Sequence, residues 1–184
     1  MMKQDINVIA PALTGKPVDE AFILGSAVWL WMHSPLHRET PLLALQDVLL
    51  PAIKHRQFVM AFENNRPVFY LSWAKLNEAT ESRYLQKDVM HLATSEWDSG
   101  ERLWFIDWIA PFGHTRAMNN WVRSRLFAGN FCARSVYHRQ HKPHGKSIQQ
   151  FRGVAVPLAV ATHWFDSHPV SFGLQKTLSE GTQS

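Results

Sequence analysis

The segment from residue 57 to residue 73 constrains the fold most, because it has the pattern of a β-hairpin. Two apolar runs, 57–62 and 68–73, flank the turn-forming residues Asn64-Asn65-Arg66-Pro67. Helical and strand patterns alternate around this hairpin. We expect helices over 21–32, 41–54, 77–93 and 116–127, and strands over 103–109, 131–137 and 147–156. This succession predicts an α/β fold with one mixed sheet flanked by helices.

The length of 184 residues predicts a single domain, and a hydrophobic fraction of 46% supplies its core. We expect a flexible leader over 1–20, the domain over 21–165, and a polar, mobile tail over 166–184. The longest apolar run, 21–32, has about a dozen residues, whereas a bilayer span needs roughly 20. With no secretion signal and one cysteine in the sequence, we expect a cytoplasmic protein without a membrane span.

The charges are unevenly distributed, because no acidic residue occurs between Asp107 and Asp166. A surface of one sign attracts acidic partners, and nucleic acid, an anionic membrane and an acidic carrier protein are all candidates. A solvated surface without a specific partner is the alternative. The basic residues of this stretch are Arg116, Arg123, Arg125, Arg134, Arg139, Lys142, Lys146 and Arg152.

The histidines do not form a convincing metal site. His33 and His37 have the i, i+4 spacing of a metal pair, but Pro35 lies between them. The repeat His138, His141 and His144 is interleaved with lysine and arginine, which favours a basic loop. We therefore expect no metal. His37 follows a helix break, where its side chain can point into a cleft, although a purely structural histidine is equally compatible with the spacing.

Asp107 lies within a predicted strand among tryptophan and isoleucine, where desolvation makes a charge costly. Strand alternation places it on the same face as Phe105 and Ile109. It is compatible with pairing to an arginine, or with orienting an imidazole and stabilising its protonated form. Cys132, between Phe131 and Ala133, has the surroundings of a buried small hydrophobe rather than of a nucleophile.

Five motifs, in this order, resemble the toxin-activating lysine acyltransferases of RTX operons, the haemolysin activators. They are Ser34-Pro35-Leu36-His37-Arg38, Leu49-Leu50-Pro51-Ala52-Ile53, Ser72-Trp73-Ala74, Trp97-Asp98-Ser99-Gly100 and Trp104-Phe105-Ile106-Asp107-Trp108-Ile109-Ala110-Pro111-Phe112-Gly113. The resemblance implies a GNAT-like fold and a cytoplasmic enzyme that moves a fatty acyl group from acyl carrier protein to internal lysines of an RTX protoxin. It implies no bound cofactor, since the acyl-phosphopantetheine of the carrier is the donor, and it leaves a homodimer open.

The resemblance also assigns the catalytic pair, which falls on His37 and Asp107. A lysine amine must lose a proton before it attacks, and His37 would accept that proton while Asp107 sets its tautomer. Ser34 and Lys146 are expected to contact substrate, although Ser34 also fits a plain turn. Direct transfer and an acyl-enzyme are both open. Docking candidates for the acidic carrier are Arg116, Arg123, Arg125 and Lys146.

Two other functions compete with this one. A basic α/β module can bind single-stranded nucleic acid through stacked aromatic side chains. A GNAT enzyme can instead use acyl-coenzyme A on a small amine, but Pro111-Phe112-Gly113-His114 stands where its glycine-rich pyrophosphate loop would be needed.

Overall fold

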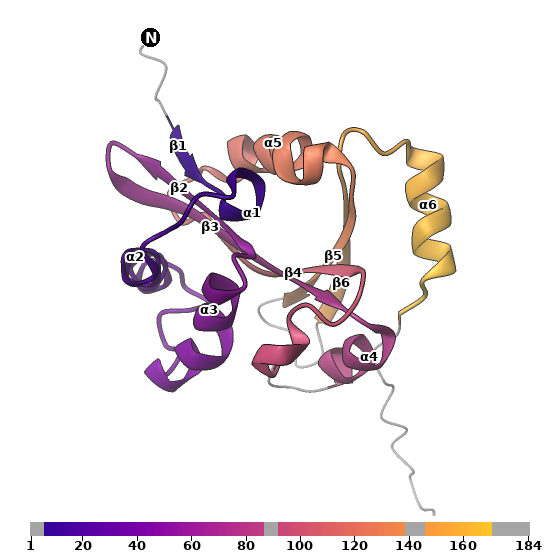
Figure 1. Ribbon diagram of the computed structural model, residues 1–184, viewed down its shortest axis with the longest axis horizontal. Coiled ribbons are helices and arrows are strands. Elements are labelled where there is room, and N and C mark those ends of the chain that lie inside the picture. The colour runs from indigo at the N-terminus through magenta and orange to yellow at the C-terminus, as the bar shows by residue number, and fades with distance from the viewer. Residues whose placement is uncertain (1–5, 87–91, 139–145, 171–184) are drawn as a thin grey trace, which may run out of the picture.

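A six-stranded sheet with helices on both faces forms the core of the protein (Figure 1). The computed structural model describes residues 6–86, 92–138 and 146–170. The strands are β1 (Ile6–Ile9), β2 (Phe58–Glu63), β3 (Arg66–Leu76), β4 (Arg102–Ile109), β5 (Cys132–His138) and β6 (Lys146–Arg152). The helices are α1 (Pro11–Thr14), α2 (Glu20–Met32), α3 (Leu45–Lys54), α4 (Glu78–Gln86), α5 (Thr115–Arg125) and α6 (Leu158–Ser167), and short 3₁₀ turns are η1 (Leu42–Ala44), η2 (Thr94–Glu96) and η3 (Leu126–Gly129).

The strands follow one another across the sheet in chain order, and every neighbouring pair is antiparallel except β4 and β5. This parallel pair is short. It joins Leu103–Phe105 to Ala133–Ser135, although β4 continues to Ile109 and β5 to His138. β4 and β5 are therefore unpaired toward their carboxyl ends, and this unpaired stretch is called the opening between them below.

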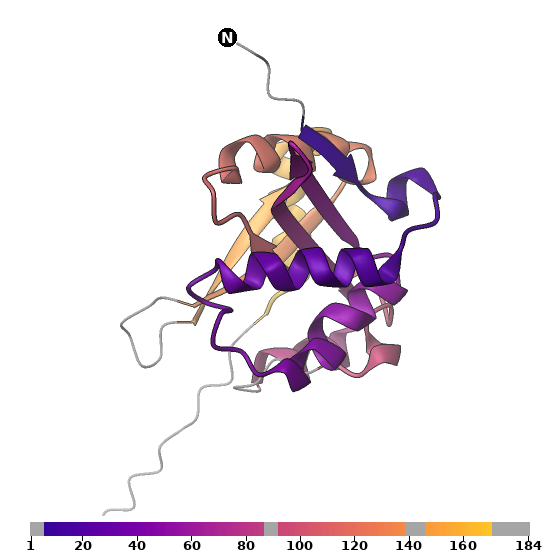
Figure 2. The same ribbon diagram turned by 90° about the vertical axis from the view of Figure 1, so that its left-hand side faces the viewer.

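Helix α2 lies across the strands of the hairpin (Figure 2). It begins after Asp19, whose side chain accepts a hydrogen bond from the Phe22 N–H at 3.0 Å and so caps the first turn. Ile23 and Leu30 are fully buried against the sheet. The helix ends at Met32, just before Ser34-Pro35, because proline disfavours helical geometry in the preceding residue.

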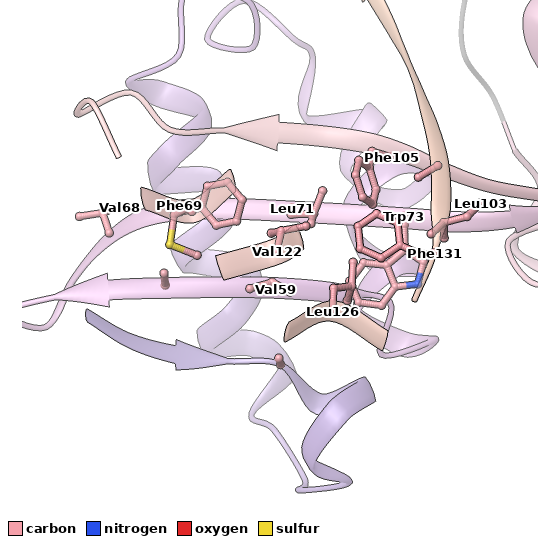
Figure 3. Close-up of a cluster of buried hydrophobic side chains, with 14 residues drawn as sticks. Val59, Val68, Phe69, Leu71, Trp73, Leu103, Phe105, Val122, Leu126 and Phe131 are labelled. Carbon is pink, nitrogen blue, oxygen red and sulfur yellow. The ribbon is translucent and has the colours of Figure 1, made fainter. Parts of the chain in front are cut away.

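The core has a layer on each face of the sheet. On one face, α5 contributes Met118 and Val122 to a cluster with Trp73 and Phe105 (Figure 3). On the other face, α2 and α3 pack over Tyr70 and the end of β4, while α4 packs on its first half. Asp107 on β4 faces the α2 side of the sheet, where it meets His37. Helix α5 packs on the opposite side.

A buried ion cluster joins α4, β4, β5 and α6. Glu81 on α4 accepts a hydrogen bond from Trp104 Nε1 at 2.8 Å and pairs with Arg102. Arg134, which is 1% exposed, lies 3.7 Å from the same carboxylate. Its guanidinium also donates to the His168 carbonyl near the end of α6. Burial lowers the pKa of Arg134, while Glu81 opposes that change.

The predicted α/β architecture with a mixed sheet flanked by helices is confirmed. From Glu20 to His138 the order of elements is helix, helix, strand, strand, helix, strand, helix, strand, as the sequence predicts. No helix in the described ranges is both long enough and apolar enough to cross a membrane.

Two expectations at the ends of the chain need correction. Residues 6–14, expected to be part of a flexible leader, form β1 and α1, and β1 pairs with β2. The last strand was expected to run to residue 156, but β6 ends at Arg152. Directly after the strand, Gly153 packs on Gly129 so closely that a Cβ would lie 1.9 Å from the Gly129 oxygen. Helix α6, which follows, was not predicted. The remainder of the expected tail, from residue 171, lies outside the described residues.

Candidate functional site

The loop after α2 holds His37 in a hydrogen-bonded turn. The His37 N–H and the Arg38 N–H both donate to the Ser34 carbonyl at 3.0 Å. The imidazole ring lies 5.2 Å from the ring of Trp31, centroid to centroid. Trp31 is buried at the end of α2, so the loop is fixed to the helix by an aromatic contact as well as by its backbone.

Asp107 reaches the same place from β4 because that strand contains a bulge. Ser72 on β3 pairs with Asp107, but the next pair is Trp73 with Phe105, so Ile106 has no partner on β3. An extra residue of this kind reverses the alternation of side chains beyond it. Asp107 therefore shares a face with Ile109, as predicted, whereas Phe105 lies on the opposite face, contrary to the prediction.

Ser34, His37 and Asp107 form one series of hydrogen bonds. Ser34 Oγ lies 2.7 Å from His37 Nδ1, and His37 Nε2 lies 3.3 Å from Asp107 Oδ1. The side chain of His37 is 19% exposed, whereas that of Asp107 is 8% exposed. A partly accessible imidazole thus connects a buried carboxylate to a buried hydroxyl.

The partners fix which imidazole nitrogen carries a proton. An ionised carboxylate only accepts hydrogen bonds, so Nε2 is the protonated nitrogen of the neutral ring and Nδ1 accepts from the Ser34 hydroxyl. The other carboxylate oxygen of Asp107 is buried and has no hydrogen-bond partner among the described residues. The nearby Tyr70 is fully buried, and burial together with the charge of Asp107 raises the pKa of its hydroxyl well above the usual range. Among the described residues, His37 is the group that lies within ion-pair distance of the Asp107 carboxylate.

Other residues singled out from the sequence lie on elements different from those that carry this series. Lys146 begins β6, opposite His138. Arg116 and Arg125 are exposed on α5, whereas the Arg123 side chain donates to the Arg152 carbonyl at 3.1 Å. Arg134, counted above with the basic stretch, is buried and belongs to the ion cluster, because Glu81 and the α6 carbonyls compensate its charge.

The remaining histidines and the cysteine have different surroundings. The His33 ring lies against the Trp29 ring, tilted by 38° with centroids 4.1 Å apart, and its Nδ1 lies 2.7 Å from the Trp29 carbonyl oxygen. His141 and His144 lie outside the described residues. Among the residues that are described, no three histidine, cysteine, aspartate or glutamate side chains are grouped as a metal site requires. Cys132 is partly buried at the start of β5, and burial raises its pKa.

A model of the RTX toxin acyltransferase family matches residues 16–152, which include all three members of the hydrogen-bond series. The chain belongs to this family. The acyltransferase is 38% identical to a protein-lysine myristoyltransferase of Kingella kingae over 151 residues, 82% of this chain and 88% of the relative. It is 39% identical to a protein-lysine myristoyltransferase of Escherichia coli over 153 residues, 83% of this chain and 84% of the relative.

A weaker likeness is structural. The loading GNATL domain of CurA from Lyngbya majuscula superposes with a TM-score of 0.47 and 8% identity, over 76% of this chain and 68% of that one.

Sequence reasoning missed Ser72 and Tyr70, which surround the carboxylate of this acyltransferase. The Asp107 N–H donates to Ser72 Oγ at 3.3 Å, which ties the bulge to β3. The strand pattern from 68 to 73 predicts where these residues lie along β3, but the register between β3 and β4 decides that they meet Asp107. That register depends on the unpaired Ile106, for which the sequence contains no local signal.

Proposed function

We propose that this acyltransferase transfers a fatty acyl group from acyl carrier protein to the ε-amino group of lysines in an RTX protoxin, with His37 and Asp107 as the catalytic pair. The hydrogen-bond series Ser34–His37–Asp107 is the observation that carries the proposal. This series occurs in a chain of the RTX toxin acyltransferase family. Two relatives of the chain are named protein-lysine myristoyltransferases.

The geometry supports a base-assisted attack. A lysine ammonium has a pKa of about 10.4 and is not nucleophilic until it loses a proton. The amine nitrogen attacks the thioester carbonyl while His37 accepts the proton at Nδ1, either directly or through the Ser34 hydroxyl. The carbon–sulfur bond then breaks, and His37 returns the proton to the departing thiolate. The products are an amide and a free phosphopantetheine thiol, and a positioned base of this kind accelerates such a reaction about 10²–10⁴-fold.

The proposed role of Asp107 rests on its few polar partners among the described residues. It fixes the Nε2–H tautomer, and its buried charge stabilises the imidazolium that forms during the attack. Among the described residues it forms its ion pair with His37. This supports an orienting carboxylate over the alternative of a structural arginine partner.

The opening between β4 and β5 supports a place for the thioester. Beyond Phe105 the backbone of β4 is not paired to β5. The Asp107 N–H points toward β3, where it donates to Ser72. Since successive N–H groups of a strand point to opposite sides, the Trp108 N–H faces the opening. A backbone donor there can stabilise the oxyanion of the tetrahedral intermediate.

Exposed apolar side chains close to His37 in the sequence support a place for an acyl chain. Four large apolar side chains are exposed here, two before His37 in the sequence and two after it, although such residues are usually buried. They are Met32 (66%), Leu36 (59%), Leu42 (78%) and Leu43 (72%). A long-chain acyl group would cover part of this apolar surface, which a short acyl donor would not.

The proposed carrier protein rests on charge complementarity. Acyl carrier protein is acidic, and Arg116 and Arg125 present exposed positive charges on α5. Lys146 extends the basic stretch at the start of β6. We further propose that the enzyme works in the cytoplasm, that it binds no cofactor of its own, and that a homodimer is compatible with this function.

The proposal is tested by incubating the purified protein with myristoyl-acyl carrier protein and the RTX protoxin encoded beside its gene. We expect mass spectrometry to show a myristoyl mass increase on protoxin lysines. Myristoyl-coenzyme A replaces the carrier in a parallel reaction, and His37→Ala protein is the negative control. Transfer that occurs only from coenzyme A, or that reaches no lysine, contradicts the proposal.

A further inference from the structure

A cavity of about 470 Å³ lies between α6, η3 and the first residues of β4 and β5. Its volume falls within the range of small-molecule sites, roughly 300–1,000 Å³. Leu103 lines it and lies four residues before Asp107, about 13 Å along β4. At this end β4 and β5 are paired, so the cavity is separate from the opening between the two strands.

Most of the wall is apolar. The sheet side contributes Leu103, Phe127 and Phe131, and α6 contributes Val160 and Trp164. Val160 is 55% exposed, so the helix leaves apolar surface uncovered at the cavity. Covering such surface with an apolar ligand is favourable by about 25 cal/mol per Å².

One wall has a strained backbone. Phe127 and Ala128 have φ angles of +49° and +54°, followed by Gly129 at +72°. Side-chain-bearing residues in this region cost about 1–3 kcal/mol each and tend to occur at functional sites. The turn is held by the Ala155 N–H, which donates to the Gly129 carbonyl at 3.0 Å. It places the Phe127 ring edge-on to Trp73, with centroids 5.6 Å apart, at the cavity wall.

Among the described residues that line the cavity, Lys75 is the one cation. The Lys75 ammonium lies 5.4 Å from the centroid of the Phe127 ring. Within the described ranges, no carboxylate forms an ion pair with Lys75. Glu101 also lines the cavity, but it is solvent-exposed, so its charge is more strongly screened than that of the half-buried Lys75. A ligand with an aliphatic chain and an anionic head matches this arrangement.

We propose that this cavity is a binding site for a long-chain fatty acid, whose carboxylate pairs with Lys75 and whose chain packs against Phe127, Phe131 and Trp164. The site is distinct from the reaction centre and does not depend on the proposed transfer. Its α6 wall lies beyond residue 152, where the family match ends. Because Leu103 belongs to β4, the bound chain contacts the strand that carries Asp107.

The only cysteine of the chain, Cys132, lines the cavity and reports its occupancy. The alkylation rate of Cys132 by iodoacetamide is measured by mass spectrometry on the full chain at a fixed pH, with increasing myristate. We expect a saturable slowing. Lys75→Met should raise the half-protecting concentration of myristate about tenfold, as expected for the loss of one charge-assisted contact. The same substitution should leave protection by myristyl alcohol unchanged.

Two substitutions on α6 make a matched pair. Val160→Phe fills the cavity and should remove the protection by myristate, measured as the ratio of rates with and without ligand. Leu158→Phe alters an exposed residue of the same helix that does not line the cavity, and it should keep the protection. The proposal is overturned if myristate does not slow alkylation saturably, or if Lys75→Met leaves its half-protecting concentration unchanged. Neither result depends on turnover, so failure of the proposed transfer would be seen separately.

Discussion

Ser72 on β3 pairs with Asp107 on β4 one step before the ladder skips Ile106. The pairing places the Asp107 carboxylate on the α2 face of the sheet, where its Oδ1 lies 3.3 Å from His37 Nε2. The two residues of the proposed catalytic pair are 70 positions apart in the chain. Their distance is therefore set by the sheet and by the turn after α2, both of which are well packed, and their roles can be tested without dismantling the fold.

His37→Ala should abolish acyl transfer without unfolding the protein. The imidazole is partly exposed on a loop, so its removal deletes few buried contacts. In the described part of the chain, no other base is hydrogen-bonded to both Ser34 and Asp107. Turnover and the melting temperature are measured on one preparation. His33→Ala, on the same segment but in ring contact with Trp29, is the control and should remain active. Retained turnover in His37→Ala would place the base elsewhere.

Asp107→Asn should lower turnover by about 10²-fold or more, because it removes the charge that stabilises the imidazolium while keeping the shape. Asp166→Asn, exposed on α6, is the matched control. A destabilised Asp107→Asn protein with normal turnover would show that the carboxylate is structural.

Ser34→Ala should reduce turnover by about tenfold and leave clear residual activity. The substitution removes one hydrogen bond to Nδ1, while Asp107 still holds the tautomer. The readout is kcat measured beside that of His37→Ala. A loss as complete as in His37→Ala would contradict a positioning role and would instead favour an acyl-enzyme on the Ser34 hydroxyl.

Tyr84→Phe should reduce the amount by which the free energy of unfolding falls at alkaline pH. The Tyr84 hydroxyl is buried without a hydrogen-bond partner, and burial raises its pKa far above the usual value. In the unfolded chain the same group ionises near pH 10. Its contribution to stability is therefore complete below about pH 10 and is lost as the pH rises above that value. The melting temperature of the wild type should therefore fall more steeply than that of the variant above about pH 10. A difference between the two melting temperatures that stays constant from neutral to alkaline pH would show that Tyr84 does not titrate on unfolding.

Two glycine substitutions should change stability in opposite directions. Gly153→Ala should cost about 3 kcal/mol, because its Cβ would overlap the Gly129 carbonyl. Gly25→Ala, in the exposed face of α2 with open space around it, should add about 0.5–1 kcal/mol through its better helix propensity. Urea denaturation measures both. A destabilised Gly25→Ala protein would mean that this helix face packs against something else.

The parts of the fold with strong local patterns could be predicted from the sequence. The hairpin, α2 and the helix break before His37 follow from apolar periodicity and from Ser34-Pro35. The meeting of His37 with Asp107 came from the family resemblance, since spacing alone left a structural histidine and an arginine-paired aspartate open. Long-range geometry was not predictable. The four-residue strand β1 is shorter than a reliable alternation, and the bulge at Ile106 exists only against β3.

Arg134 shows why the sequence beyond the family match matters for this chain. Position 134 reads as one more surface charge, yet its guanidinium is enclosed between Glu81 and the carbonyls of Phe165 and His168. A chain shortened after residue 152 would keep the residues of the hydrogen-bond series at His37 but would remove those carbonyls and uncover the Arg134 cation on β5. Helix α6 thus covers the buried charge of β5, and we expect α6 and Arg134 to be retained or lost together.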